Sequence, residues 1–244
     1  MLAAGAGTRL RPLTDRLPKA LIEVAGRPLL AHVLDRLVEA GATRIIVNCH
    51  YHEHQIRSFL GSYAPGGVDI VVSPEPDGPY DTGGGLFRAA RLFQEKAPFL
   101  LHNVDVLSKI PLDGLLAAHR AERNSAGDRF IASLAVQARD ANRQLLFDAE
   151  GLLGWENRGN DGAVLETRRV REPIGELTRW SFTGIHALEP DVFHLHDRSG
   201  SFSIITLYLE LAAQGSVIRP IDMSGFPWID VGTHERLVQA RETW

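Results

Sequence analysis

Apolar and polar positions alternate along the first half of the chain in two rhythms: short β-branched runs and longer amphipathic helical patterns. The clearest helical pattern follows Pro28, where apolar residues recur from Leu29 to Val38 and Gly41 can end the helix. This alternation is typical of βαβ units that build a mainly parallel sheet. The other predicted elements of this half are a strand end at 2–4, strands at 44–49, 68–73 and 98–103, and helices at 53–60 and after Thr82.

The second half of the chain has a different pattern. Short strands joined by polar turns are predicted at 130–136, 144–147 and 152–155, and we interpret them as a small β insertion that contains a hairpin. The two halves together predict a single α/β domain with a Rossmann-like, mixed and mostly parallel sheet flanked by helices. The remaining predicted elements are a helix at 203–214, strands at 217–221 and 228–231, and a helix from Thr233.

The composition of the chain limits the kinds of molecule that it is expected to bind. A net charge of −4 gives no basic face for nucleic acid, so any phosphate chemistry must be local. The single cysteine, Cys49, cannot form an intrachain disulfide, which is compatible with a reducing cytoplasm. The longest apolar runs are a few residues long, and we recognise no signal peptide. We therefore expect a soluble cytoplasmic protein with no nucleic-acid or membrane partner.

The candidate chemistry is concentrated between Leu2 and Lys19. Gly5 and Gly7 follow the first predicted strand, and glycines allow backbone N–H groups to approach an anion closely. Arginine can bind phosphate with two parallel hydrogen bonds, and lysine acts as a point charge. The segment therefore predicts a triphosphate cradle. Its four basic residues are Arg9, Arg11, Arg16 and Lys19.

Two common phosphate-binding loops do not fit this segment. A dinucleotide-binding turn needs a third glycine where Leu10 stands, and Pro12 and Pro18 keep the segment irregular. A Walker A loop needs Gly-Lys-Ser/Thr, which the segment lacks. The remaining alternative without a ligand is a glycine-rich surface loop with solvated charges.

At this point the sequence resembles a known family, the nucleoside-diphosphate-sugar pyrophosphorylases, whose signature is L-A-A-G-x-G-T-R-L-x-P-L-T followed by P-K. Further similarity lies at 24–29, 81–85, 103–105, 182–185 and 228–233, so it spans the chain. The resemblance implies a nucleotide-diphospho-sugar transferase fold with a nucleotide-binding half at about 1–110 and a sugar-binding half at about 111–244. It also implies that a sugar 1-phosphate attacks the α-phosphate of a nucleoside triphosphate with the help of Mg²⁺.

The resemblance assigns roles to particular residues. Arg9, Lys19 and Asp105 are implied as catalytic residues. Asp105 and Asp230 are implied as Mg²⁺ ligands, and two carboxylates completed by phosphate oxygens and water are sufficient for this ion; a structural cap is the alternative for either aspartate. The implied nucleotide-binding residues are Leu2, Ala3, Ala4, Gly5, Gly7, Thr8, Arg9, Lys19, Glu75, Gly83, Gly84 and Asn103. The implied sugar-binding residues are Thr82, Gly84, Asp105 and Gly184.

Thr82 is a candidate for the start of a helix, although the three glycines after it make a helix less stable there. Thr82 can cap a helix, yet each of Gly83, Gly84 and Gly85 costs about 1 kcal/mol relative to alanine there. We therefore expect something to approach this backbone closely. The resemblance implies nucleobase and sugar, and a flexible loop is the alternative.

Two positions depart from the family pattern. Met1 leaves almost no apolar residues before the first motif, so we expect a short first strand. The usual N-G-D of the metal loop appears with Val104 in place of glycine, and valine cannot readily adopt a positive φ.

The substrates are less well defined than the reaction. Through the three glycines and the compact length the chain resembles the uridylyltransferases of cell-wall recycling, and this resemblance implies UTP as the favoured nucleotide. Mannose- or heptose-1-phosphate guanylyltransferases are the main alternative. A glycosyltransferase that uses a nucleotide sugar and a non-catalytic regulatory relative also remain. No hexapeptide repeat is present, so we expect a monomer or a small homo-oligomer.

Overall fold

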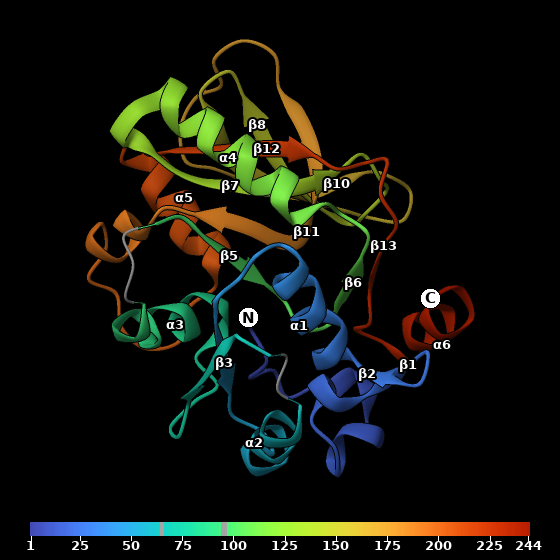
Figure 1. Cartoon of the computed structure of the whole chain (residues 1–244). Coiled ribbons are helices and arrows are strands. Elements are labelled where there is room, and N and C mark those ends of the chain that lie inside the picture. Colours follow the sequence, from blue (N-terminus) through green and yellow to red (C-terminus); the bar gives the residue numbers. More distant parts are fainter. Residues whose placement is uncertain (64–65, 94–96) are drawn as a thin grey trace.

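The computed structural model describes residues 1–63, 66–93 and 97–244, and its centre is a seven-stranded mixed sheet (Figure 1). The strand order is β10-β9-β8-β11-β7-β12, and β5 pairs with β11 as well. The strands are β5 (Phe99–His102), β7 (Phe130–Gln137), β8 (Arg143–Asp148), β9 (Gly151–Arg158), β10 (Val164–Arg169), β11 (Thr178–Leu188) and β12 (Val217–Asp222).

A smaller parallel pair belongs to the first half of the chain. Strand β3 (Arg44–Cys49) pairs in parallel with β4 (Asp69–Pro74). Leu2 joins this pair to the main sheet, because it forms parallel bridges with Asn48 at β3 and with Asn103 after β5. The predicted strand end at 2–4 is thus reduced to one bridging residue.

The mixed sheet is confirmed, but parallel pairing does not dominate it as predicted. Strand β11 is antiparallel to β5, β7 and β8, and the β8-β9-β10 ladder is antiparallel throughout. The physical reason is the connection between strands. Hairpins link antiparallel neighbours directly, whereas a parallel neighbour needs a crossover of a dozen or more residues. Of the predicted β insertion, 144–147 and 152–155 belong to β8 and β9 of this ladder, whereas 130–136 belongs to β7, which pairs with β11 and β12.

Helices cover both faces of the sheet. Alternate residues of β7 belong to different apolar clusters: Ala135 packs in one, and Leu134 and Val136 pack in the other. Because alternate side chains of a strand point to opposite faces, these clusters mark the two sides. The helices are α1 (Leu29–Glu39), α2 (Glu53–Ser62), α3 (Asp81–Arg88), α4 (Leu112–Ala126), α5 (Ile204–Ala213) and α6 (His234–Thr243). Those of the first half, α5 and α6 agree with the predicted elements.

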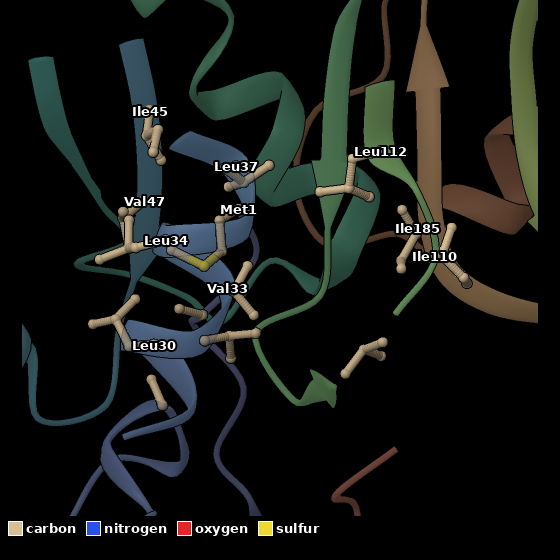
Figure 2. Close-up of a cluster of buried hydrophobic side chains, with 14 of the residues drawn as sticks. Met1, Leu30, Val33, Leu34, Leu37, Ile45, Val47, Ile110, Leu112 and Ile185 are labelled. Atoms are coloured by element: carbon tan, nitrogen blue, oxygen red, sulfur yellow. The ribbon is translucent and has the colours of Figure 1, made fainter. Parts of the chain in front are cut away.

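The first apolar cluster holds the beginning of the chain in place. The predicted apolar face of α1 turns toward β3, where Ile45 and Val47 meet it (Figure 2). Met1 is buried in the same cluster, and its amino group donates a hydrogen bond of 2.7 Å to the carbonyl of Ile46. Each fully buried aliphatic side chain stabilises the fold by about 1.5–3 kcal/mol. The α1 residues in the cluster are Leu30, Val33, Leu34 and Leu37.

The elements that were not predicted from the sequence include α4, β10 and β11. Helix α4 buries only Leu112, Leu115 and His119, so one of its three core positions is polar. All side chains of β10 are exposed, which removes the apolar alternation of a half-buried strand. Strand β11 is interrupted by a shift in register between Phe182 and His186. In each case the local pattern that identifies an element is weak or broken.

Among the described residues, no helix has both the length and the apolar character needed to cross a bilayer.

Candidate functional site

A cavity of about 280 Å³ opens where the Leu2 segment ends between β3 and β5. Asn48, Pro79, Asp81, Val104 and Gly232 complete its wall. The long segment that the sequence singled out therefore faces a cavity, together with residues from four later parts of the chain. Of the predicted site residues, those lining the cavity are Leu2, Ala3, Ala4, Gly5, Gly7, Thr8, Arg9, Lys19, Thr82, Asn103 and Asp105.

Gly7 creates the turn that directs Thr8 and Arg9 to the cavity. Its φ is 61°, in the left-handed region that glycine adopts without strain. A Cβ at this position would lie 2.8 Å from the Cγ2 atom of Thr14, whose hydroxyl donates to the Gly7 carbonyl. At Gly5, by contrast, no described atom lies within 4 Å of the position of a Cβ. The backbone at Gly5 is therefore open to a ligand.

Lys19 and two aspartates form the charged part of the site. The Lys19 ammonium donates to a carboxylate oxygen of Asp105, and their side chains are only 11% and 23% exposed. Strand β6 (Val106–Ser108) pairs with β13 (Trp228–Asp230) so that Val106 is opposite Asp230. This pairing brings Asp230 next to Asp105.

Asp230 is a buried carboxylate with an unused oxygen. Its Oδ1 has no hydrogen-bond partner among the described residues. Burial, and then the charge of Asp105, raise the pKa of Asp230. A Cβ at Gly232 would lie 2.7 Å from this Oδ1 and 3.0 Å from Nη2 of Arg9, so the carboxylate and the guanidinium share the space beside Gly232.

These two carboxylates fit a divalent cation with hard oxygen preferences. The unpartnered Oδ1 of Asp230 offers a ligand atom, and a cation would relieve the repulsion between the two carboxylates. Within the described ranges, no group of three or more histidine, cysteine, aspartate or glutamate side chains could hold a metal. The remaining ligands would thus be substrate oxygens and water, which is the coordination that Mg²⁺ favours.

Gly83 and Gly84 do not line the cavity. Their N–H groups donate to the carbonyl of Phe202, at 2.9 and 3.2 Å. A Cβ at Gly83 would lie 2.5 Å from the Phe202 ring, and one at Gly84 would lie 2.2 Å from the carbonyl oxygen of Gly200. The close approach predicted for these glycines is therefore made by residues 200–203 of the same chain.

Thr82 was also predicted to cap the helix, and this prediction was wrong. Helix α3 begins one residue earlier, at Asp81, which has a φ of 60°. The Thr82 hydroxyl instead accepts a hydrogen bond of 2.9 Å from the N–H of Ile204. Thr82 thus joins α3 to α5 while its surface lines the cavity.

Glu75 lies behind the cavity wall. It is 1% exposed and accepts hydrogen bonds from the amide of Asn48, at 2.6 Å, and from the N–H of Tyr80, at 2.9 Å. Asn48 lines the cavity and accepts from the N–H of Ala3 at 2.6 Å. Sequence reasoning missed Asn48. Its position near the carboxyl end of a predicted parallel strand was the signal that could have found it.

Gly184 also acts through another residue. Its φ is 82°, and a Cβ would lie 2.8 Å from the side-chain amide of Asn103. The Gly184 carbonyl accepts a hydrogen bond of 3.0 Å from the N–H of Asn103, which lines the cavity. Val104 fits without the positive φ of a glycine, because it is buried in the first apolar cluster and its N–H bonds to the Leu2 carbonyl.

The arrangement combines an open glycine backbone, two cationic side chains and a carboxylate pair at one cavity, and its chemistry fits a polyphosphate with a divalent cation. Residues 1–144 match the family model described as nucleotidyl transferase. The chain therefore belongs to the nucleotidyl transferase family. At this level the predicted enzyme class and the resemblance to the nucleoside-diphosphate-sugar pyrophosphorylases are confirmed.

Individual relatives extend the similarity over the whole chain. The N-acetylmuramate alpha-1-phosphate uridylyltransferase of Neisseria meningitidis serogroup B is 33% identical over 241 residues, which cover 99% of this chain and 95% of the relative. The enzyme of the same name from Caulobacter vibrioides is 33% identical, with 89% and 85% covered. A mannose-1-phosphate guanyltransferase of Pichia angusta is 30% identical over 95% of this chain and 60% of the relative.

Solved structures confirm the fold. A UDP-glucose pyrophosphorylase from Acinetobacter baumanii superposes with a TM-score of 0.75 at 16% identity, over 99% of this chain and 90% of that one. An inositol-1-phosphate CTP transferase from T. maritima gives a TM-score of 0.66 at 17% identity, over 99% and 95%.

Proposed function

We propose that this enzyme joins a sugar 1-phosphate to a nucleoside triphosphate, with UTP favoured, and releases pyrophosphate in a reaction that requires Mg²⁺. The single observation that supports this most strongly is the meeting of Arg9, Lys19 and Asp105 at one cavity, with Asp230 beside them. A glycosyltransferase that uses a finished nucleotide sugar has no need of the Arg9 and Lys19 cations. A regulatory relative has no need of all four residues.

The chain's own residues would act by positioning and by charge. An anionic phosphate oxygen of the sugar 1-phosphate attacks the α-phosphorus, the bond to the bridging oxygen of the β-phosphate breaks, and pyrophosphate leaves with that electron pair. The attacking oxygen is already ionised, so no side chain has to remove a proton. Arg9 and Lys19 would neutralise the charge that develops on the phosphoryl oxygens.

Asp105 and Asp230 would hold Mg²⁺, which would supply positive charge that lowers the repulsion between the two anionic reactants. The Lys19 ammonium, which binds Asp105 and already lines the cavity, would lie beside the phosphates.

The two uridylyltransferase relatives support UTP as the nucleotide and N-acetylmuramate 1-phosphate as the first sugar to test. The guanyltransferase relative supports GTP with mannose 1-phosphate as the alternative pair. The cytoplasm is the expected compartment, since Cys49 is a free buried thiol. A monomer or a small homo-oligomer stays our prediction.

The direct test measures pyrophosphate release with Mg²⁺, each of the four nucleoside triphosphates, and a panel of sugar 1-phosphates that includes both named sugars. We expect the highest kcat/KM with UTP and N-acetylmuramate 1-phosphate. A higher value with GTP and mannose 1-phosphate would replace this substrate assignment by the alternative one. Absence of pyrophosphate with every pair would refute the proposed reaction. A Lys19→Ala preparation made in parallel excludes a contaminating activity.

A further inference from the structure

The second half of the chain contains several arginines that could hold the phosphate of the second reactant. Three of them are already neutralised. Arg171 makes two hydrogen bonds of 2.6 Å to Asp148, whose side chain is fully buried. Arg158 and Arg179 both bind the carboxylate of Glu156, which is 3% exposed. None of these guanidinium groups is available to an anion without breaking an ion pair.

Arg139 differs from these arginines. Its Cζ lies 4.0 Å from the centroid of the Trp228 ring, and its Nη2 donates a hydrogen bond of 3.2 Å to the carbonyl of Phe182. Its Nε is buried without a hydrogen-bond partner in the described part of the chain, and no ion pair with a described carboxylate involves it. Arg139 is thus a half-buried cation that is held in place without an ion pair among the described residues.

The place of Arg139 is set by β13. Trp228 and Asp230 are alternate residues of this strand, so their side chains project from the same face. Arg139 lies on the Trp228 ring, and Arg9 lies beside Gly232, two positions beyond Asp230. Burial has the largest effect on the pKa of Arg139 and lowers it, the charge of Arg236 also lowers it, and the charge of Asp230 raises it. Arg139 and Arg9 therefore lie at opposite ends of the stretch from Trp228 to Gly232 that contains Asp230.

The shift in register within β11 helps to hold Arg139 and Trp228 in place. Gly184, with its positive φ, lies inside the register shift between Phe182 and His186. The shift frees two carbonyl groups from the sheet: that of Phe182 accepts from Arg139, and that of Thr183 accepts a 2.8 Å hydrogen bond from the Trp228 indole. The irregular strand thus fixes both the cation and the aromatic ring on which it lies.

Building on the proposed function, we propose that Arg139, held on the ring of Trp228, binds the phosphate of the sugar 1-phosphate. A stacked guanidinium keeps the edge donors of its plane available, and two parallel N–H groups match the spacing of phosphate oxygens. Arg9 and Lys19 then hold the triphosphate on one side of Asp230, and Arg139 holds the second anion on the other. The Nη1 group remains available to this anion, because no hydrogen bond within the described chain uses it.

The test compares Arg139→Ala with Arg143→Ala, because Arg143 lies 4.3 Å over the Trp155 ring in the same kind of stack, within β8 and β9. A charged hydrogen bond contributes about 1.5–3 kcal/mol, so KM for N-acetylmuramate 1-phosphate should rise about 10- to 100-fold in Arg139→Ala. KM for UTP should change less than about twofold in both variants, since neither touches the triphosphate cradle. Arg139→Lys keeps the charge and should be intermediate.

Three results would overturn the subsite: an unchanged KM for the sugar phosphate in Arg139→Ala, an equal rise of both KM values, or the same rise in Arg143→Ala. Wild-type enzyme that releases no pyrophosphate with any pair would refute the proposed function and not the subsite. In that case the subsite is still tested by calorimetry, which measures the binding of N-acetylmuramate 1-phosphate with inorganic phosphate as a competitor. Binding that Arg139→Ala and Arg139→Lys retain at wild-type strength refutes the subsite. Thermal unfolding of each variant identifies any that fails to fold.

Discussion

The ammonium group of Lys19 binds the carboxylate of Asp105 although 86 positions separate them in the chain. Lys19 opens a short 3₁₀ helix after Pro18, and Asp105 stands between β5 and β6. Their ion pair lies at the wall of the cavity, where the two side chains are mostly shielded from water. The ion pair therefore holds the Lys19 ammonium group at the cavity wall before any substrate binds. Electrostatic catalysis needs this kind of preorganised charge.

Replacing Lys19 by alanine tests the cradle. We expect kcat to fall by about 10²–10³, because one well-placed cation contributes about 3–4 kcal/mol to transition-state stabilisation. The measurement is pyrophosphate release at saturating concentrations of both substrates. Arg16→Ala is the matched control, since Arg16 belongs to the same basic segment but is exposed and does not line the cavity. Full activity of Lys19→Ala, or an equal loss in Arg16→Ala, would contradict the assignment.

Asp230→Asn separates metal binding from stability. Burial and the neighbouring Asp105 raise the pKa of Asp230, so the ionised carboxylate is unfavourable in the metal-free fold. The variant should therefore unfold at an equal or higher urea concentration without Mg²⁺, by up to about 1 kcal/mol. Its activity should require at least about tenfold more Mg²⁺.

Urea midpoints and Mg²⁺ titrations of the rate, each compared with the exposed control Asp197→Asn, provide the check for Asp230. A variant that is less stable without metal and keeps the wild-type Mg²⁺ requirement would show that Asp230 has only a structural role.

Gly84→Ala tests why α3 begins with glycines. A Cβ at Gly84 would lie 2.2 Å from the Gly200 carbonyl oxygen, so residues 200–203 must move. We expect a loss of about 1–3 kcal/mol in the free energy of unfolding, as for other overpacked sites. In Gly61, within α2, no described atom lies within 4 Å of the added Cβ, and Gly61→Ala should stabilise the protein by up to about 1 kcal/mol. Chemical denaturation of both variants decides, and a neutral Gly84→Ala would disprove the packing explanation.

Three buried histidines are expected to make the fold less stable at acid pH. Burial lowers the pKa of His102 and His119 to about 4 and that of His186 to about 3. Below an unfolded-state pKa of about 6.5, the unfolded chain binds protons that the folded chain does not, so stability falls as pH falls. Each histidine should contribute up to about 1.4 kcal/mol per pH unit between pH 6 and pH 4.5.

Urea unfolding across this pH range measures the slope. His119→Gln should lower it by roughly one third, since one of three such groups is removed, whereas the exposed His54→Gln should leave it as it is. A slope that does not change in His119→Gln would show that His119 takes up its proton in the folded state.

Arg9, Lys19 and the glycines before them could be predicted as cavity residues because they form one continuous segment with unusual chemistry, whereas Arg11 and Arg16 of the same segment do not line the cavity. The elements with regular apolar spacing, such as α1 and β3, could be predicted for the same local reason. The surroundings of Gly83 and Gly84 could not. A glycine reveals that something comes close, but only the packing of residues 200–203 shows that the neighbour is Phe202.

The roles of Asn48 and Arg139 could not be predicted from the sequence either. Both are ordinary polar residues in the sequence, and both acquire a role only through distant partners: Ala3 and Glu75 for Asn48, and Trp228 and Phe182 for Arg139. A strand such as β11, whose register shifts within a few residues, also hides its period from any local pattern. Long-range pairing decides these features.

Strands β5 and β6 of the first half find their antiparallel partners, β11 and β13, in the second half. The part of the chain that surrounds the triphosphate cradle is therefore not a detachable module. A fragment ending near residue 110 would expose the edges of two strands and leave Asp105 without Asp230, whose strand pairs with β6. Such a fragment should aggregate through those open edges. A chimaera that joins two relatives at that boundary should work only if both strands of each pair, β5 with β11 and β6 with β13, come from the same relative.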